Sequence, residues 1–541
     1  MGFWLGVALF ALLLWLPAPR SMVETVRTRF ADDIAREAAA GKRPESAVAE
    51  RLTNRMMAVA AVTALTACWW VTVAIPIPAT SLLPMVLFPL VGVMSVSTAA
   101  APYANRNVFL FMGGFIIALG MQRTGLHRRI ALNILAFVGS QPARLVLGFM
   151  IASAFLSMWI SNTATALLLL PIGLAVIDEL RSRSADNVPG RTAHENFACA
   201  TMLGIAYAAS IGGIATPIGT PPNIAFRGQL AQLFPTAPEI SFGAWFAGLL
   251  PLVVVMVFAT WWVLTRVTCR VPRIADDDAA ARRVIRDQLH ALGRMDRAET
   301  LMTIVFSTTA LLWITRQISV GGAEYGWPNL IERMLGDASR FRADFVDDTT
   351  IAVGVAVLMF LIPAGREVDG NVRRLMDWET AGKLPWGILL LFGGGFSLAA
   401  GMQMSGLSAW LGDAFAGLGM TDPLLLIAST CGLLTFLTEI TSNTATAEIM
   451  IPIAANAGVA AGVNPLLMMT PAAISASLAF MLPVATPPNA IVFGSGYVDM
   501  GRMVKTGIIL NLIGVVVATA VVYFVLRPLW GIGAGLPEWV R

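Results

Sequence analysis

Repeated apolar segments are the feature of this sequence that most limits what it can fold into. Most of them are long enough for a helix to cross about 30 Å of hydrocarbon. Because backbone polar groups in lipid must be hydrogen-bonded within the protein, only helices and closed barrels span a membrane, and segments of this length indicate helices. The predicted apolar segments are residues 3–18, 56–75, 81–98, 107–121, 142–180, 194–235, 243–265, 299–315, 349–363, 385–405, 423–458, 465–497 and 504–526.

The composition agrees with this interpretation. Hydrophobic residues make up 57% of the chain and charged residues only 13%, whereas soluble proteins carry about 25% charged residues. The composition therefore excludes a cytosolic enzyme, a nucleic-acid binder and a disordered scaffold. The four cysteines and three histidines are scattered and lack the spacing of a metal centre. We predict an all-α polytopic protein of the lipid bilayer, multi-pass in the plasma (inner) membrane.

The first apolar segment, residues 3–18, is interpreted as a retained helix rather than a signal peptide. No basic residue precedes it, and no convincing small-residue cleavage site follows it. Residues 20–55 come next and are charged and helix-prone. They are predicted to form a surface segment, whose role the sequence does not specify.

Basic residues in the loops predict the orientation of the chain. Arginine and lysine gather within residues 181–191, 266–297 and 366–383, and these three loops are expected in the cytoplasm. The loop at 317–348 is acidic and is expected outside. Counting spans back from Arg128 and Arg129 places residues 20–55 outside as well, although that segment carries eight basic side chains among its acids.

Three groups of motifs occur twice in the chain. Gly-Gly-Phe at Gly113, Gly-Met-Gln at Gly120 and Gly-Leu at Gly125 return 281 positions later. Ser-Asn-Thr-Ala-Thr-Ala begins at Ser161 and returns at the same offset from Ser442. Thr-Pro-Pro-Asn begins at Thr220 and returns 266 positions later. Such self-similarity indicates an internal structural repeat.

The number of predicted crossings between the two Ser-Asn-Thr motifs is odd, so the two copies are predicted to be inverted relative to each other. Inverted repeats place a substrate site near the bilayer midplane, built from interrupted helices. Residues 142–180 and 423–458 are too long for one span and carry the motif near the middle, which predicts a re-entrant hairpin with the motif at its tip. The Pro-Pro pairs at Pro221 and Pro487 predict a break in the next helix of each repeat.

Each of these motifs, taken alone, can also be explained by helix packing without a binding site. Ser and Thr join membrane helices, Gly-Gly lets helices approach, and Pro-Pro kinks a helix. Two inverted sets of motifs, each containing Asn, favour a binding site instead, because backbone released at membrane depth persists where it is buried or lines a cavity.

The repeated motifs resemble those of the divalent anion/sodium symporter family, which includes bacterial dicarboxylate transporters. The resemblance rests on the Ser-Asn-Thr pair, the Gly-Thr-Pro-Pro-Asn and Ala-Thr-Pro-Pro-Asn loops, and Leu-Pro-Trp-Gly-Ile-Leu-Leu-Leu-Phe-Gly-Gly-Gly from Leu384. It covers nearly the whole chain after residue 56. It implies about eleven transmembrane helices, a homodimer, and a scaffold domain along which a transport domain moves as an elevator. The corresponding parts here are 1–139 and 269–420 for the scaffold, and 140–268 and 421–541 for the transport domain.

The resemblance also implies site residues. In the family, one sodium ion is held at positions that match Ser157, Ser161, Asn162 and Gly219 in this sequence. A second sodium ion is held at positions that match Thr438, Thr441, Asn443 and Ala485. The substrate carboxylates meet positions that match Asn162, Thr163, Thr220, Asn443, Thr444, Thr486 and Pro487.

The charge pattern near the motifs points to cation coupling. No Lys, Arg or His occurs from Leu384 to Gly501, nor between Leu145 and Leu180, so neither hairpin tip offers a basic side chain to a dianion. Helix N-termini supply about half a charge each, and an uncompensated double charge away from water is prohibitively costly. Bound sodium ions are the expected compensation. Protons are the weaker alternative, because only Glu439 and Glu448 lie close to a motif.

The sequence therefore predicts a secondary active transporter that couples sodium to small dicarboxylates such as succinate, malate or fumarate. Alternatives within the family are a sodium-independent dicarboxylate exchanger and a sulfate or tricarboxylate carrier. An anion channel would need a continuous pore with rings of charge, and none is evident. The protein is not expected to be an enzyme, because Glu439 has no neighbouring acid or base and is interpreted as structural.

Overall fold

The structure is a computed structural model, and it describes residues 2–40, 44–139, 141–183, 188–271, 278–320, 323–336, 340–366, 372–416 and 422–540. Within these ranges, seven helices are long and apolar enough to cross a membrane, or eight if the bent pair α1 and α2 forms one span. The prediction of an all-α polytopic membrane protein is confirmed. The family's eleven helices stay an expectation.

The two repeats are visible as two matching series of helices. Each series has a long helix, a shorter helix, a helix hairpin, a broken helix and a final long helix. The first series is α8 Arg106–Thr124, α9 Leu126–Val138, α10 Pro142–Ser157, α11 Asn162–Arg183, α12 Val188–Gly213, α13 Pro221–Leu233 and α14 Phe242–Trp262. The second is α20 Trp386–Ser405, α21 Leu407–Ala416, α22 Pro423–Leu437, α23 Asn443–Ala460, α24 Leu466–Ser475, α25 Pro487–Phe493 and α26 Met500–Val521.

The repeated glycines have two structural functions. Gly125 and Gly406 end α8 and α20 in the left-handed region, with φ of 78° and 80°, where glycine has no steric cost. Gly113 and Gly394 allow close backbone approach instead. A Cβ on Gly113 would lie 2.7 Å from the Ala352 carbonyl carbon, and one on Gly394 would lie 2.4 Å from the Ser81 carbonyl oxygen.

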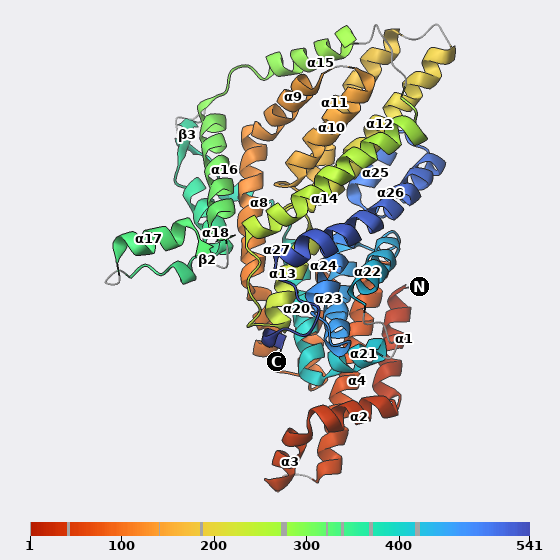
Figure 1. Ribbon diagram of the computed structural model, residues 1–541, viewed down its shortest axis with the longest axis vertical. Helices are drawn as coiled ribbons and strands as arrows, with labels where there is room; N and C mark the ends of the chain where they lie inside the picture. The colour runs from red at the N-terminus through yellow and green to blue at the C-terminus, as the bar shows by residue number, and fades with distance from the viewer. Residues whose placement is uncertain are drawn as a thin grey trace.

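The two series run in opposite directions. In Figure 1, α9 lies at the upper end of the molecule beneath α15 (Asp278–Ala291), whereas its counterpart α21 lies near the lower end beside α2 and α4. The hairpins α10–α11 and α22–α23 have their turns at residues 158–161 and 438–442, so each carries its Ser-Asn-Thr motif at the tip, as predicted.

The N-terminal part agrees with the helical prediction over residues 20–55 and differs from the prediction at residues 81–98. Residues 20–55 form α2 Arg20–Arg29, α3 Ala31–Ala39 and the start of α4 Glu45–Thr72, which continues into the membrane segment. The single span predicted at 81–98 is wrong. Prolines at 84 and 89 and Gly92, with φ of 73°, divide it. The other elements of the N-terminal part are α1 Gly2–Trp15, α5 Ile77–Thr80, α6 Leu83–Leu90, α7 Val96–Ala100 and η1 Ala101–Ala104.

The remaining elements lie around and between the repeats. Two short antiparallel hairpins, β1–β2 and β3–β4, join helices on the left of Figure 1. These elements are η2 Val263–Thr268, α16 Arg297–Thr315, β1 Ile318–Val320, β2 Ala323–Tyr325, α17 Trp327–Leu335, η3 Ala343–Phe345, α18 Asp348–Met359, β3 Pro363–Arg366, β4 Val372–Arg374, α19 Trp378–Ala381, η4 Val522–Leu526, α27 Arg527–Leu529 and η5 Glu538–Val540.

A buried ion network joins α13 to α16 and α18. Asp348 is 1% exposed and accepts hydrogen bonds from Arg316 Nε at 2.7 Å, from Arg227 Nη2 at 3.0 Å and from the Phe242 amide at 3.0 Å. Glu239 accepts from the same two arginines. Because the opposite charges are paired, the network can be buried, although Arg227 Nη1 has no hydrogen-bond partner among the described residues. The network holds the start of α14 against α16 and α18.

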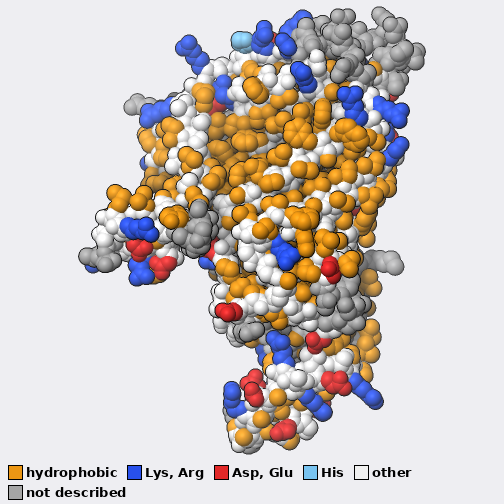
Figure 2. Space-filling model, in the orientation of Figure 1, with side chains coloured by type: hydrophobic (Ala, Val, Ile, Leu, Met, Phe, Trp, Pro, Cys, Tyr) orange, Lys and Arg blue, Asp and Glu red, His pale blue; other side chains and the backbone are white. Residues whose placement is uncertain are grey.

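The surface agrees with a membrane protein. Figure 2 shows hydrophobic side chains over the middle of the visible face, lysines and arginines at the upper end, and both charge signs at the lower end. The described parts of the three basic loops lie toward the upper end, and α2 and α3 lie at the opposite one. This arrangement matches the counted topology, in which residues 20–55 are on the other side from the basic loops. Parts of these loops, and residues 41–43, lie outside the described residues.

Candidate functional site

The first hairpin tip gathers oxygen atoms around the side-chain amide of Asn162. One terminal atom of this amide, either its oxygen or its nitrogen, lies 2.5 Å from Ser157 Oγ and 3.3 Å from the carbonyl oxygens of Ala209 and Gly219. With nitrogen at that position, the amide donates to all three oxygens. With its own oxygen there, four oxygens converge on one point. A Cβ on Gly213 would lie 2.8 Å from the amide oxygen, so the cluster needs glycine there.

The second hairpin tip repeats this arrangement. Thr438 Oγ1 donates to Asn443 Oδ1 at 2.7 Å and lies 3.1 Å from the Ala476 carbonyl oxygen. Thr438 and Asn443 thus correspond to Ser157 and Asn162. The Thr441 hydroxyl instead donates to the Leu437 carbonyl at 2.8 Å, inside the hairpin. The same hydroxyl lies 2.5 Å from Thr446 Oγ1, so it is turned toward its own hairpin rather than toward Asn443.

The helix breaks begin before the prolines rather than at them. The first break covers residues 214–220, and the second covers 476–486. Pro221 and Pro487 stand at the first position of α13 and α25, where the missing N–H costs nothing. The prolines therefore start the second half of each broken helix, with Thr220 and Thr486 as the N-cap residues.

The Asn residues of Thr-Pro-Pro-Asn close both breaks. Asn223 Nδ2 donates to the carbonyls of Gly213 at 3.0 Å and Thr216 at 2.7 Å. Asn489 Nδ2 donates to Ala479 at 3.1 Å and Leu482 at 3.1 Å. Both side chains are fully buried. The motif alone does not predict this role, although the repetition of Asn223 at Asn489 is a signal that both positions matter.

Glu439 stabilises the helix break of the second repeat and has no counterpart in the first. It is 3% exposed, and its carboxylate accepts from the backbone N–H groups of Phe480 at 2.6 Å, Met481 at 2.9 Å and Leu482 at 3.1 Å. Asn511 Nδ2 also donates to it, at 2.8 Å. This carboxylate replaces the helical partners that the break removes, which fits its interpretation as structural. The matching position in the first repeat is Met158.

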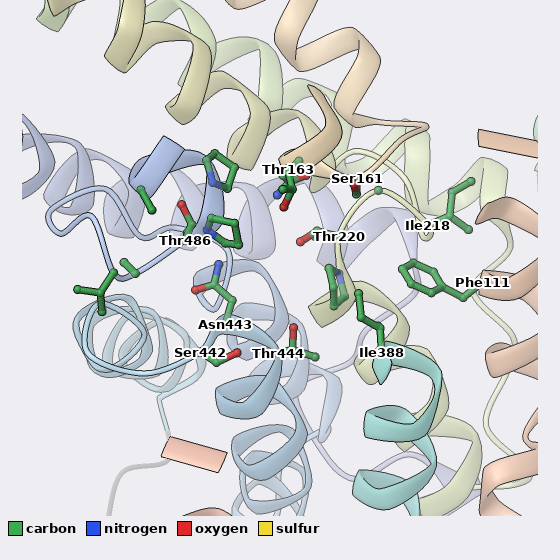
Figure 3. A pocket seen from close by; sticks show the side chains of 18 of the residues that line it. Phe111, Ser161, Thr163, Ile218, Thr220, Ile388, Ser442, Asn443, Thr444 and Thr486 are labelled. Carbon is green, nitrogen blue, oxygen red and sulfur yellow. The ribbon is translucent and has the colours of Figure 1, made fainter. Parts of the chain in front are cut away.

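Both tips and both breaks meet at one cavity of about 410 Å³. Figure 3 shows the side chains of Ser161 and Thr163 facing those of Asn443 and Thr444 across it, with Thr220 and Thr486 between them. Phe111 and Ile388, from α8 and α20, form a wall at one side.

The structure brings the predicted residues together. All seven predicted substrate positions line the cavity: Asn162, Thr163, Thr220, Asn443, Thr444, Thr486 and Pro487. Of the predicted sodium positions, Ser161, Asn162, Gly219, Asn443 and Ala485 line it, whereas Ser157, Thr438 and Thr441 lie behind the two Asn residues or within the hairpin. Sequence reasoning missed the lining residues Phe111, Phe115, Ile218, Pro221, Ile388, Ser442, Pro483, Val484, Pro488 and Ala490.

The cavity has polar groups but no formal charge. Among its lining residues, all in the described part of the chain, none carries a charged side chain. Helices α11 and α23 begin at Asn162 and Asn443, so their first-turn N–H groups lack helical partners and their positive dipole ends face the cavity. This environment suits anionic groups near the helix starts and cations near the oxygen clusters.

Comparison with known families decides the assignment. The model of the sodium:sulfate symporter transmembrane region matches residues 44–531. This chain belongs to that family. Sodium-dependent dicarboxylate transporter SdcS of Staphylococcus saprophyticus is 42% identical over 489 residues, which cover 90% of this chain and 89% of that protein. SdcS of Staphylococcus aureus strain USA300 is 42% identical over 479 residues, covering 88% of each chain.

Two solved structures share the fold of this family member. The YdaH transporter of Alcanivorax borkumensis superposes with a TM-score of 0.51 at 15% identity, covering 88% of this chain and 99% of the other. MtrF of Neisseria gonorrhoeae gives 0.50 at 14% identity, covering 82% and 86%. These likenesses support the polytopic helical fold. The relatives are transporters by name, which agrees with the expectation that this family member is not an enzyme.

Proposed function

We propose that this protein is a secondary active transporter that couples the movement of sodium ions to that of small dicarboxylates. The observation that carries the proposal is the single cavity in which the Asn of both inverted motifs, Asn162 and Asn443, face the same space. The dicarboxylate specificity is that of the SdcS relatives.

The cavity suits a short molecule with two acidic ends. Thr163 and Thr220 lie near the first hairpin tip, and Thr444 and Thr486 lie near the second. Each pair supplies hydroxyl groups for one carboxylate, next to the N-terminus of α11 or α23. The side chains of Phe111 and Ile388 supply an apolar wall for the carbon chain between the carboxylates.

The amide of Asn162 explains how a sodium ion fits. With nitrogen as the inner atom, this amide donates to the oxygens of Ser157, Ala209 and Gly219. With its oxygen as the inner atom, the same amide joins the oxygens of Ser157, Ala209 and Gly219 in a set of four hard ligands, which suits a sodium ion. We assign the first sodium site to Ser157, Ser161, Asn162 and Gly219, with the Ala209 carbonyl added by the structure. The second comprises Thr438, Thr441, Asn443 and Ala485, with the Ala476 carbonyl added.

The division into moving and fixed parts is also a proposal. Residues 140–268 and 421–541 form the transport domain, and residues 1–139 and 269–420 the scaffold. In support, α12 packs against α25, α13 against α23, and α14 against α26, whereas α4 packs against α20 and α8 against α18. The boundaries at 139/140 and 420/421 fall at residues outside the described part of the chain. Elevator movement and a homodimer complete the proposal.

Uptake into proteoliposomes tests the function. Labelled succinate uptake at fixed pH is expected to stop when choline replaces sodium. Uptake that persists undiminished, or that follows a proton gradient alone, contradicts the sodium assignment and favours the exchanger or a proton-coupled carrier. Competition by malate, citrate and sulfate then separates dicarboxylate transport from sulfate or tricarboxylate transport. Stimulated counterflow, in which substrate on one side accelerates exchange from the other, distinguishes a carrier from a channel.

A further inference from the structure

A buried carboxyl lies one helical turn from the cavity and has no role in the proposed transport site. Glu448 follows Thr444 by four residues on α23, so the two side chains share a helix face. Thr444 lines the cavity, and Glu448 lies deeper, 3% exposed, where α23 meets α13 and α20.

Two glycines allow the neighbouring helices to pack closely around this carboxyl. A Cβ on Gly395 of α20 would lie 2.0 Å from Glu448 Oε2, so the backbone of α20 lies directly against the carboxyl. A Cβ on Gly228 of α13 would lie 1.8 Å from the ring of Phe396. These close approaches bring three helices together with little room for water beside the carboxyl.

The hydrogen bonds at Glu448 are half complete. Gln229 Nε2 on α13 donates to Glu448 Oε2 at 2.9 Å, and within the described residues this is the carboxyl's one hydrogen bond. Glu448 Oε1 and Gln229 Oε1 are both buried acceptors with no donor. An acid and an amide that face each other form two parallel hydrogen bonds only if the acid carries its proton. A proton on Oε1 is the donor that both oxygens lack.

Among the described residues, no cationic side chain forms a hydrogen bond or ion pair with Glu448 that would compensate its negative charge. The helices α20, α22 and α24 carry no charged side chain in their described residues. The Arg227 guanidinium, two residues from Gln229, is bound to Asp348 and Glu239. The other charged or titratable side chains on elements packed against α23 form no hydrogen bond with Glu448: Glu45, Glu50, Arg51, Arg55 and Cys68 on α4, Asp413 on α21 and Cys431 on α22.

We propose that Glu448 is a proton-binding site, occupied in this conformation, whose neutral form lets α23 pack against α20 and α13. An alkali cation is a poorer occupant of this place than a proton, because its ligands would be only the two unpaired oxygens, Glu448 Oε1 and Gln229 Oε1. An ionised carboxylate would be buried without a counter-charge. Raising the pH therefore opposes this packing. α20 belongs to the proposed scaffold and α23 to the proposed transport domain, so this packing is one of the contacts that the two domains form during transport. Transport is therefore expected to slow as Glu448 loses its proton.

Infrared difference spectroscopy of the purified protein in lipid tests the site without substrate or sodium. We expect the carbonyl-stretch band of a protonated carboxylic acid at neutral pH, absent in Glu448→Gln and retained in Glu379→Gln, a control that removes an exposed carboxyl. In Gln229→Met, which leaves Glu448 in place, the band is expected to shift because the amide partner is gone. A missing band in the wild-type protein, or an unshifted band in Gln229→Met, overturns the proposal.

The transport consequence rests on the proposed function and is measured separately. Fumarate is suitable because it stays fully ionised from neutral to alkaline pH. Once Glu448 titrates, its protonated fraction falls about tenfold per pH unit, so wild-type uptake is expected to fall by up to about tenfold per pH unit. Glu448→Gln, in which two amides pair, is expected to have a flat profile. Equal slopes in both proteins overturn the transport role, and absent uptake in both overturns the proposed function while leaving the infrared result intact.

Discussion

Asn223 and Asn489 make the same hydrogen bonds in opposite repeats. Each side-chain nitrogen donates to the carbonyls ten and seven positions before it, Gly213 and Thr216 in one case and Ala479 and Leu482 in the other. The Asn of Thr-Pro-Pro-Asn thus closes the backbone that lines the cavity. It acts by satisfying buried carbonyl groups where a helix cannot.

Removing either closing amide is expected to destabilise the protein. Asn223→Ala or Asn489→Ala leaves buried carbonyls without donors, and each unsatisfied group costs about 1–3 kcal/mol. Thermal unfolding of the purified variants should show lower midpoints than the wild type. Asn456→Ala is the matched control, because its amide donates within its own helix, to Pro452. A loss in Asn456→Ala equal to that in the other two variants would contradict the assignment.

The two tip asparagines are expected to be essential for uptake. Asn162→Ala or Asn443→Ala removes an amide that serves both a cation site and the substrate, so uptake should be abolished while the protein still reaches the membrane. Surface labelling and fluorescence of a tagged protein measure the membrane level. The exposed Asn133→Ala on α9 provides the control. Unchanged kinetics in both tip variants would return the motifs to a packing role.

The two threonines next to them are expected to affect affinity instead. Thr163→Ala and Thr444→Ala each remove a hydroxyl that donates to a carboxylate, and a hydrogen bond to a charged group contributes about 1.5–3 kcal/mol. The KM for succinate should rise by about 10- to 150-fold. The control is Ser429→Ala, whose hydroxyl donates to Leu426 within α22. A fall in kcat at unchanged KM would argue against substrate contact.

The inverted repeat predicts opposite labelling of the hairpin bases. Single cysteines at Arg181 and Asp422, both exposed, should react with membrane-impermeant thiol reagents from opposite faces. The native cysteines do not interfere if Cys68, the one that is partly exposed, is first replaced by Ala. Labelling of both positions from the same face would contradict the inversion. Cysteines near Ser161 and Ser442 should likewise react from opposite sides when each gate opens.

The buried ion network is expected to depend on Asp348. Asp348→Ala leaves Arg227 and Arg316 without their buried acceptor, and breaking one partner of a buried pair costs about 3–5 kcal/mol. The unfolding midpoint should fall more than in Asp344→Ala, which removes an exposed carboxylate that pairs with Arg342. Similar midpoints for the two variants would show that the network contributes little.

Much of the site could be predicted because the chain carries it twice. The offset of 281 positions paired Asn162 with Asn443, and the odd number of crossings placed the two tips opposite each other. Phe111, Phe115 and Ile388 were missed because their contribution depends on which helix packs beside the tips. The repeat also carries no information about the backbone groups that Glu439 binds, because the matching position, Met158, is apolar.

The sequence by itself determined the environment and the local breaks. Apolar length selects membrane helices, paired prolines interrupt one helix of each repeat, and the lack of basic residues leaves cations to balance an anion. Tertiary structure decided which carbonyls the breaks expose, and which donors satisfy the rest. It also placed Gln229 of one repeat beside Glu448 of the other, 219 positions away. Such pairs depend on how helices from opposite repeats cross, and a local pattern along one helix carries no information about the partner that packs against it.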